Sequence, residues 1–207
     1  MDPQHEWWRR TLAVAARPRS VFAALREGSQ DDLEARQEPV LAIVLLAGIG
    51  GILATPAWNG IMDNPERDGL VVAVLTFVGG GLYGTAAYFI AGGALALALR
   101  GLGAVSTFRR ARHTLAFAVA PLALLIVVAL VELAVYGEDA LSSGGDDDGT
   151  GAVAFVVLQL AIVAWAFSLL AYGIRVVEGF SWSRALASLG LVALFVSAFS
   201  VLANGLL

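Results

Sequence analysis

Five long apolar runs constrain this chain more than any other feature of its sequence. A helix needs roughly 20 residues to cross a bilayer, and each run comes close to or exceeds that length. Helices in a soluble core carry a polar stripe, whereas these runs are apolar on all sides. Hydrophobic residues make up 58% of the chain and charged residues 14%, which leaves too little polar chain to cover the runs in water. We therefore predict an all-α, polytopic transmembrane helix bundle with five spans, at residues 40–58, 70–99, 114–136, 152–177 and 185–207.

The run at residues 70–99 is longer than one perpendicular span but contains no polar turn. We expect one long helix that is tilted or bent rather than two spans. Gly80 and Gly84 in this run form a small-xxx-small pair, which lets helices approach closely. Such a pair predicts packing inside the bundle or, alternatively, dimerisation.

The placement of arginine predicts the orientation of the spans. All 13 basic residues are Arg, and counting alternate segments puts twelve on one side and only Arg67 on the other. Basic residues accumulate on the cytoplasmic side of membrane proteins. We expect a multi-pass protein of the plasma (cytoplasmic) membrane, with the N-terminus in the cytoplasm and the C-terminus outside. The first 39 residues show no pattern of a cleavable signal peptide.

Residues 1–39 are predicted to form a cytoplasmic amphipathic segment followed by a linker. Trp8, Leu12 and Ala15 fall on one side of a first helix-like stretch, and a second begins near Pro18 with an apolar face of Val21, Phe22 and Leu25. Basic amphipathic segments with Trp are typical of membrane interfaces. The alternative is that the helix packs across the cytoplasmic ends of the bundle.

The basic loop before the third run is a candidate contact for lipid or for a protein partner. It contains no acidic residue, so membrane lipids, in particular anionic ones, are the expected ligands. The candidate contact residues are Trp7, Trp8, Arg100, Arg109, Arg110 and Arg112.

Two polar residues lie inside the spans. Glu132 and Gln159 fall at similar depths in neighbouring runs, which predicts an interhelical hydrogen bond. A proton or cation site and simple snorkelling are the alternatives. Pro121 should kink the third run, because proline removes a helical donor.

Three parts of the sequence form a recognisable series. Residues 7–25 contain a tryptophan followed by a proline and a Phe-x-x-Leu element. Residues 106–122 contain a basic loop that leads to an aromatic residue four positions before a proline, and residues 165–185 contain a Trp-bearing helix followed by a final loop. In this order the three parts resemble the Yip-domain family, the Ypt-interacting-protein type of five-span membrane proteins. Eukaryotic members of the family act in vesicle trafficking and bind small GTPases of the Rab type. The chain resembles a short, prokaryotic-type member.

The resemblance implies a non-enzymatic membrane protein that organises the membrane or its partner proteins. The alternatives are a small transporter or channel and, less favoured, a lipid-handling enzyme. A transporter would need a polar path, for which the sequence offers Glu132, Gln159, Tyr83, Tyr88 and Thr85. No motif predicts a catalytic residue, a cofactor, a metal site or a nucleic-acid partner.

Overall fold

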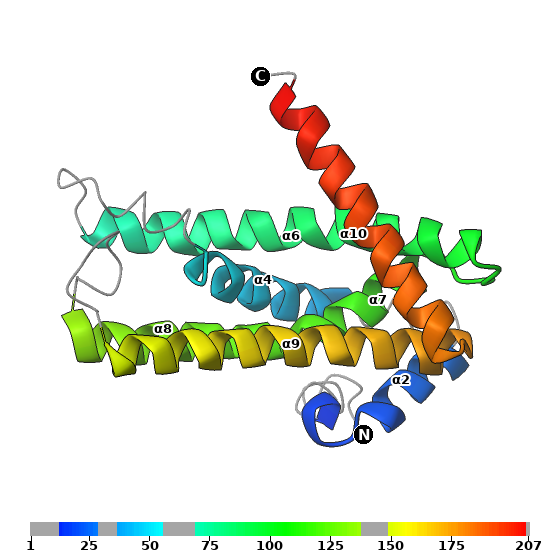
Figure 1. The fold of residues 1–207 in the computed structure, drawn as a ribbon, viewed down its shortest axis with the longest axis horizontal. Coiled ribbons are helices and arrows are strands. Elements are labelled where there is room, and N and C mark those ends of the chain that lie inside the picture. Colours follow the sequence, from blue (N-terminus) through cyan, green and yellow to red (C-terminus); the bar gives the residue numbers. More distant parts are fainter. Residues whose placement is uncertain (1–12, 29–36, 56–68, 138–148, 206–207) are drawn as a thin grey trace. The chain divides into compact units, whose positions relative to one another are not determined.

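The computed structural model describes residues 13–28, 37–55, 69–137 and 149–205. Within these ranges the chain forms helices and no strand (Figure 1), which confirms the predicted all-α fold. The elements are α2 (Pro18–Glu27), α4 (Gln37–Leu53), α6 (Gly69–Gly101), α7 (Phe108–Val119), the 3-10 helix η1 (Ala120–Ala123), α8 (Leu124–Tyr136), α9 (Thr150–Glu178) and α10 (Trp182–Gly205).

A backbone N–H or C=O group without a hydrogen bond is costly in lipid. An α-helix avoids this cost because its peptide groups form hydrogen bonds with one another. Three stretches are long and apolar enough to cross a membrane, namely Leu70–Gly101, Phe108–Tyr136 and Thr150–Glu178. Val40–Leu53 and Trp182–Ala198 are apolar but shorter. A helical membrane bundle is therefore confirmed, whereas the count of five spans stays a prediction.

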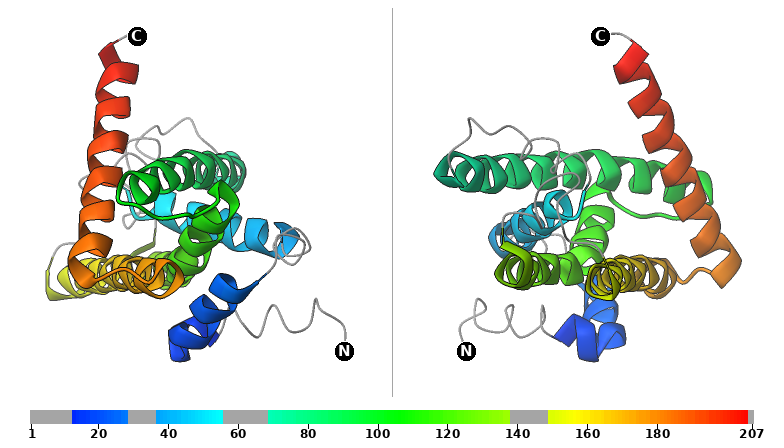
Figure 2. Two further views of the ribbon diagram at one scale, coloured as in Figure 1. Left: turned by 90° about the vertical axis from the view of Figure 1, so that its right-hand side faces the viewer. Right: turned by 60° about the vertical axis from the view of Figure 1, so that its left-hand side comes forward.

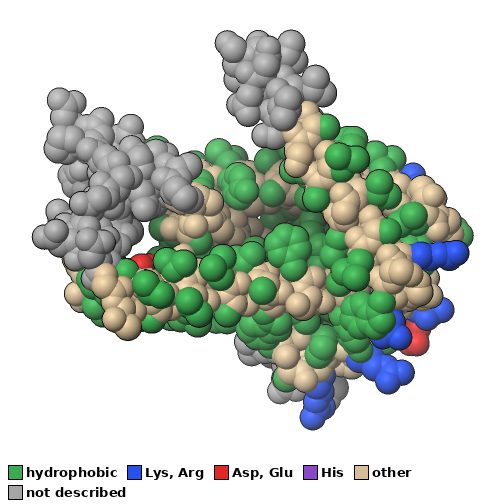
Figure 3. Space-filling view, viewed as in Figure 1, with side chains coloured by type: hydrophobic (Ala, Val, Ile, Leu, Met, Phe, Trp, Pro, Cys, Tyr) green, Lys and Arg blue, Asp and Glu red, His purple; other side chains and the backbone are tan. Residues whose placement is uncertain are grey.

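Large apolar side chains cover much of the outside of these helices (Figure 3). On α6, Leu70 is 71% exposed, Phe77 69% and Leu82 67%. Exposed apolar area on this scale marks contact with lipid or protein rather than with water. The glycine-rich run at residues 70–99 forms one unbroken helix, α6.

The chain divides into two compact units, and each is described by itself. The basic unit consists of Met1–Leu41, Ala86–Ala118 and Phe167–Leu207, and the apolar unit consists of Ala42–Thr85 and Val119–Ala166. Both α6 and α9 contribute residues to each unit.

In the apolar unit, glycine residues bring α4 and the first half of α6 into backbone contact. A methyl group on Gly84 would meet the carbonyl oxygen of Val44 and would lie 2.8 Å from Cα of Gly48. A methyl group on Gly80 would lie 2.7 Å from Cα of Ile49. The Gly80–Gly84 pair therefore serves packing within the chain, the first of the two roles that its spacing predicts.

Also in the apolar unit, α8 packs alongside the first half of α9 (Figures 1 and 2). Leu125 and Val128 of α8 form a buried cluster with Ile162 of α9. Pro121, the residue predicted to kink the third run, lies in η1 directly before α8. Since proline has no N–H group, the helix changes locally to 3-10 geometry at this point.

In the basic unit, α2 packs its apolar face onto α9. Phe22 is fully buried, and its ring meets that of Tyr172 edge-on, with 6.5 Å between ring centroids. Gly173 leaves room for this ring, because a methyl group there would lie 2.7 Å from Cε1 of Phe22. Val21 and Leu25 are buried as well. Packing against the bundle is thus the interpretation that the structure shows for α2.

Candidate functional site

Charge is strongly concentrated in the basic unit, where Figure 3 shows Arg side chains gathered on the surface. The only acids whose side chains are described in this unit are Glu27 and Glu178. In the described part of the apolar unit, Glu132 is the only charged residue. The nine described arginines all belong to the basic unit, and they are Arg17, Arg19, Arg26, Arg100, Arg109, Arg110, Arg112, Arg175 and Arg184.

The four arginines predicted as one contact surface occupy different environments. Arg100 is exposed, and its Nε donates a hydrogen bond of 3.3 Å to the carbonyl oxygen of Ser106. Arg109 and Arg110 are half-buried, whereas Arg112 is only 8% exposed. The other two predicted contact residues, Trp7 and Trp8, lie outside the described residues.

Three aromatic rings surround the guanidinium of Arg112. Its Cζ lies 5.2 Å from the ring centroid of Tyr88, 4.7 Å from that of Phe89 and 4.6 Å from that of Phe108. A guanidinium within about 6 Å of a ring centroid is attracted to the π electrons of the ring. We call Tyr88, Phe89 and Phe108 the aromatic cage of Arg112.

Local sequence explains how the aromatic cage forms. Phe108 and Arg112 are four residues apart on α7, so they share one face of the helix. The α7 helix begins after Thr107, whose hydroxyl accepts a hydrogen bond of 3.2 Å from the backbone N–H of Arg110.

The facing part of α6 contributes Gly92 and Gly93. A methyl group on Gly92 would meet Cγ of Arg112, and one on Gly93 would lie 3.1 Å from Cε2 of Phe108. Sequence reasoning missed Phe89 and Gly92 as parts of this site. An aromatic pair followed one turn later by a glycine pair was the available signal.

A second contact between arginine and aromatic rings lies at the turn from α9 to α10. The Cζ atom of Arg175 lies 4.9 Å from the ring centroid of Trp182, and that of Arg184 lies 6.0 Å from the ring centroid of Phe180. Ser181 caps the start of α10 by accepting a hydrogen bond of 3.4 Å from the backbone N–H of Arg184. Trp182 remains 48% exposed.

Glu132 and Gln159 meet in the apolar unit. Gln159 Nε2 donates a hydrogen bond of 3.1 Å to Glu132 Oε2, between α8 and α9. The rings of Tyr136 and Phe155 pack beside this pair at 6.0 Å between centroids. This is the interhelical hydrogen bond that the depths of the two residues predict.

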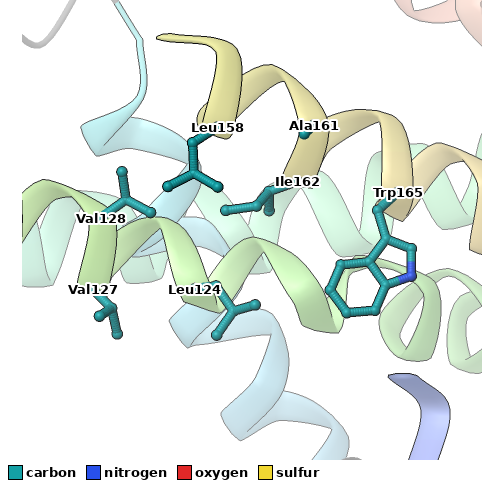
Figure 4. Close-up of a pocket in the computed structure, with 7 residues that line it drawn as sticks. All are labelled: Leu124, Val127, Val128, Leu158, Ala161, Ile162 and Trp165. Carbon is teal, nitrogen blue, oxygen red and sulfur yellow. The ribbon is translucent and has the colours of Figure 1, made fainter. Parts of the chain in front are cut away.

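A cavity of about 410 Å³ lies between α8 and α9 (Figure 4). Its lining contains neither Glu132 nor Gln159, and it contains none of the other three residues proposed for a polar path. Thr85 instead donates to the carbonyl oxygen of Gly81 at 2.8 Å, and Tyr83 is 54% exposed. The cavity therefore gives no support to a transport path. The lining is apolar and consists of Leu124, Val127, Val128, Leu158, Ala161, Ile162 and Trp165.

Across residues 13–28, 37–55, 69–137 and 149–205, no three His, Asp or Glu residues gather into a site for a metal ion. The nine described arginines of the basic unit supply cationic groups that can bind anions.

Comparison with known families gives one match. The family model described as the Yip1 domain matches residues 12–203, nearly the whole chain, and confirms the resemblance seen in the sequence. No curated protein and no solved structure matches the chain.

Proposed function

This chain belongs to the Yip1 domain family, and we propose that it is a non-enzymatic membrane protein that organises the membrane or its partner proteins. Its place is the cytoplasmic membrane, with the N-terminus in the cytoplasm and the C-terminus outside. The basic unit then meets the cytoplasmic leaflet and contacts its anionic lipids.

The separation of charge carries this proposal. The described side chains of the basic unit include nine arginines, six of them exposed, and only two acids. A basic residue close to an anionic leaflet contributes about 1 kcal/mol to the attraction, and salt weakens it beyond a Debye length of about 8 Å. An exposed cluster of arginines can therefore enrich anionic lipid around the protein.

The packing of α2 supports the same proposal. Its apolar face is occupied by α9, while Arg17, Arg19 and Arg26 remain exposed. The helix is thereby fixed to the bundle, and three exposed positive charges lie on it or, for Arg17, directly before it. A rigid cationic helix can bind a headgroup layer without first paying the entropy of folding.

The test changes the charge of α2 and leaves its packing intact. The full chain is placed in nanodiscs of mixed anionic and zwitterionic phospholipid, and the lipids retained are counted by native mass spectrometry. Changing Arg17, Arg19 and Arg26 to Gln should lower the enrichment of anionic lipid several-fold at low salt. The matched variant with Lys at all three positions keeps the charge and should retain the enrichment.

Equal enrichment in the wild type and the Gln variant would refute the proposed lipid contact of α2. Equal loss in the Gln and Lys variants would show that charge is not the cause. Raising the ionic strength should reduce the enrichment of the wild type toward that of the Gln variant.

A further inference from the structure

Arg112 is the most buried arginine that the structure describes, and it has no anionic partner there. Its Nε atom is fully buried without a hydrogen-bond partner. Residues 86–118 contain no Asp or Glu. Within the described ranges Arg112 makes no hydrogen bond or ion pair through its side chain. Contacts with aromatic rings offset only part of the cost of burying a charge, so an anion is needed to complete the site.

The aromatic cage holds the guanidinium in place and leaves one side open. Tyr88 is 3% exposed and closes the cage on the inside, whereas Phe89 is 43% and Phe108 40% exposed. Of the three side-chain nitrogens of Arg112, only Nε is among the fully buried atoms without a hydrogen-bond partner. A guanidinium fixed in this way presents its paired donors to a ligand at little further loss of side-chain entropy.

Arg112 lies on α7 and packs against α6 at a level that suits a ligand at the lipid headgroups. Arg112 packs against Gly92, which lies about 12 Å from Arg100 along the helix. The 33 residues of α6 extend for about 50 Å, more than the hydrocarbon core of about 30 Å. With α6 centred on the bilayer, Gly92 lies within about one helical turn of the core boundary. Lipid phosphates lie just beyond that boundary.

We infer that Arg112, positioned by Tyr88, Phe89 and Phe108, binds one phosphate group in the open side of the aromatic cage. The planar guanidinium donates two parallel hydrogen bonds to phosphate oxygens, an arrangement that lysine cannot make. The phosphate belongs either to an anionic phospholipid or to a soluble phosphate. This inference rests on the proposed contact with anionic lipid and narrows it from a surface to one side chain.

The test compares Arg112→Met and Arg112→Lys with wild type in the full chain. Methionine removes a buried charge and keeps an unbranched side chain, so the variant should stay folded, which its thermal melt in detergent verifies. After extensive delipidation, the wild type should retain about one anionic phospholipid per chain in native mass spectra. Retention should fall about 10- to 100-fold in Arg112→Met, and Arg112→Lys should be weakened as well. Leu97→Met, which places the same side chain at an exposed position of α6 outside the aromatic cage, is the control and should keep the lipid.

A second arm identifies the source of the phosphate. Lipid-free protein in detergent is titrated with inorganic phosphate and followed by calorimetry. If the wild type binds inorganic phosphate, Arg112→Met does not, and the wild type retains no lipid, then the site binds a soluble phosphate. Retained lipid that millimolar phosphate does not displace assigns it to a headgroup.

If wild type and Arg112→Met retain lipid equally and neither binds phosphate, the inference is wrong. The inference is also wrong if Arg112→Met dissociates an oligomer but changes neither lipid retention nor phosphate binding. The anion beside Arg112 would then be a carboxylate of a second copy of the chain. The proposed function fails differently, if the variant with Gln at Arg17, Arg19 and Arg26 keeps the enrichment of anionic lipid that the wild type shows. Either result can occur without the other.

Discussion

The contact between α4 and α6 makes a sharp prediction for Gly84→Ala. The added methyl group would meet the carbonyl oxygen of Val44 and would lie 2.8 Å from Cα of Gly48. Non-bonded carbon atoms pack at about 3.5–4.0 Å, so the methyl group is about 1 Å too close to a backbone atom that cannot rotate away. The two helices must separate by a similar distance. Overpacking of this kind costs about 1–3 kcal/mol.

Gly79→Ala is the matched reference for this change. Beyond the nearby backbone of α6 itself, no atom of the described residues lies within 4 Å of a methyl group on Gly79, which is in the same helix. Both substitutions gain the same helix propensity, up to about 1 kcal/mol over glycine, so their difference isolates the contact. We expect Gly84→Ala to be less stable than Gly79→Ala by about 1–3 kcal/mol. Gly81→Ala should resemble the reference, because its methyl group would meet only the end of the flexible Leu45 side chain, at 3.1 Å.

The assay is reversible unfolding in mixed micelles with increasing denaturing detergent, followed by circular dichroism. The free energies of unfolding of the three variants are compared at one detergent composition. A difference below about 0.5 kcal/mol between Gly84→Ala and Gly79→Ala would show that α4 and α6 part without cost, and the packing argument would then fail.

Three further predictions follow from other contacts and from the charge pattern. Gly173→Leu should push the Phe22 ring off α9 and increase amide hydrogen exchange across α2, and unchanged protection would contradict the packing described here. Glu132→Gln should leave the thermal midpoint nearly unchanged, because an amide oxygen still accepts the hydrogen bond from Gln159 of α9. Glu132→Ala should lower the free energy of unfolding by about 0.6–2 kcal/mol. Equal midpoints for both variants would show that the hydrogen bond does not stabilise the fold. Reporter fusions after Gly103 should report the cytoplasm, and fusions after Gly145 and after Leu207 should report the outside. A cytoplasmic C-terminus would rule out five spans.

Much of the fold could be predicted because the membrane leaves few choices. In lipid, a charge-free run such as residues 70–99 must form a helix to pair its own backbone groups, and α6 is that helix. The pairing of Glu132 with Gln159 was also predictable, since depth follows directly from residue count in a helix.

The environment of each arginine could not be predicted in the same way. Arg109, Arg110 and Arg112 are close in sequence and carry the same charge, yet only Arg112 is buried. The difference depends on which side of α7 faces α6 and on the space left by Gly92. Composition and periodicity do not determine the side that faces α6, because α7 carries arginines on several of its faces. The docking of α2 on α9 was open for a similar reason, since one amphipathic face suits lipid and protein equally well.

The packing of α2 also has a consequence for synthesis. Phe22 contacts a position, Gly173, that is made about 150 residues later. At about 5–20 residues per second, the ribosome takes roughly 8–30 s to supply the surface that α2 finally covers. During that interval Val21, Phe22 and Leu25 have no α9 to bury them, and a basic amphipathic helix binds the membrane interface. We therefore expect α2 to bind the membrane interface during translation and to move from lipid onto α9 late in the assembly of the basic unit.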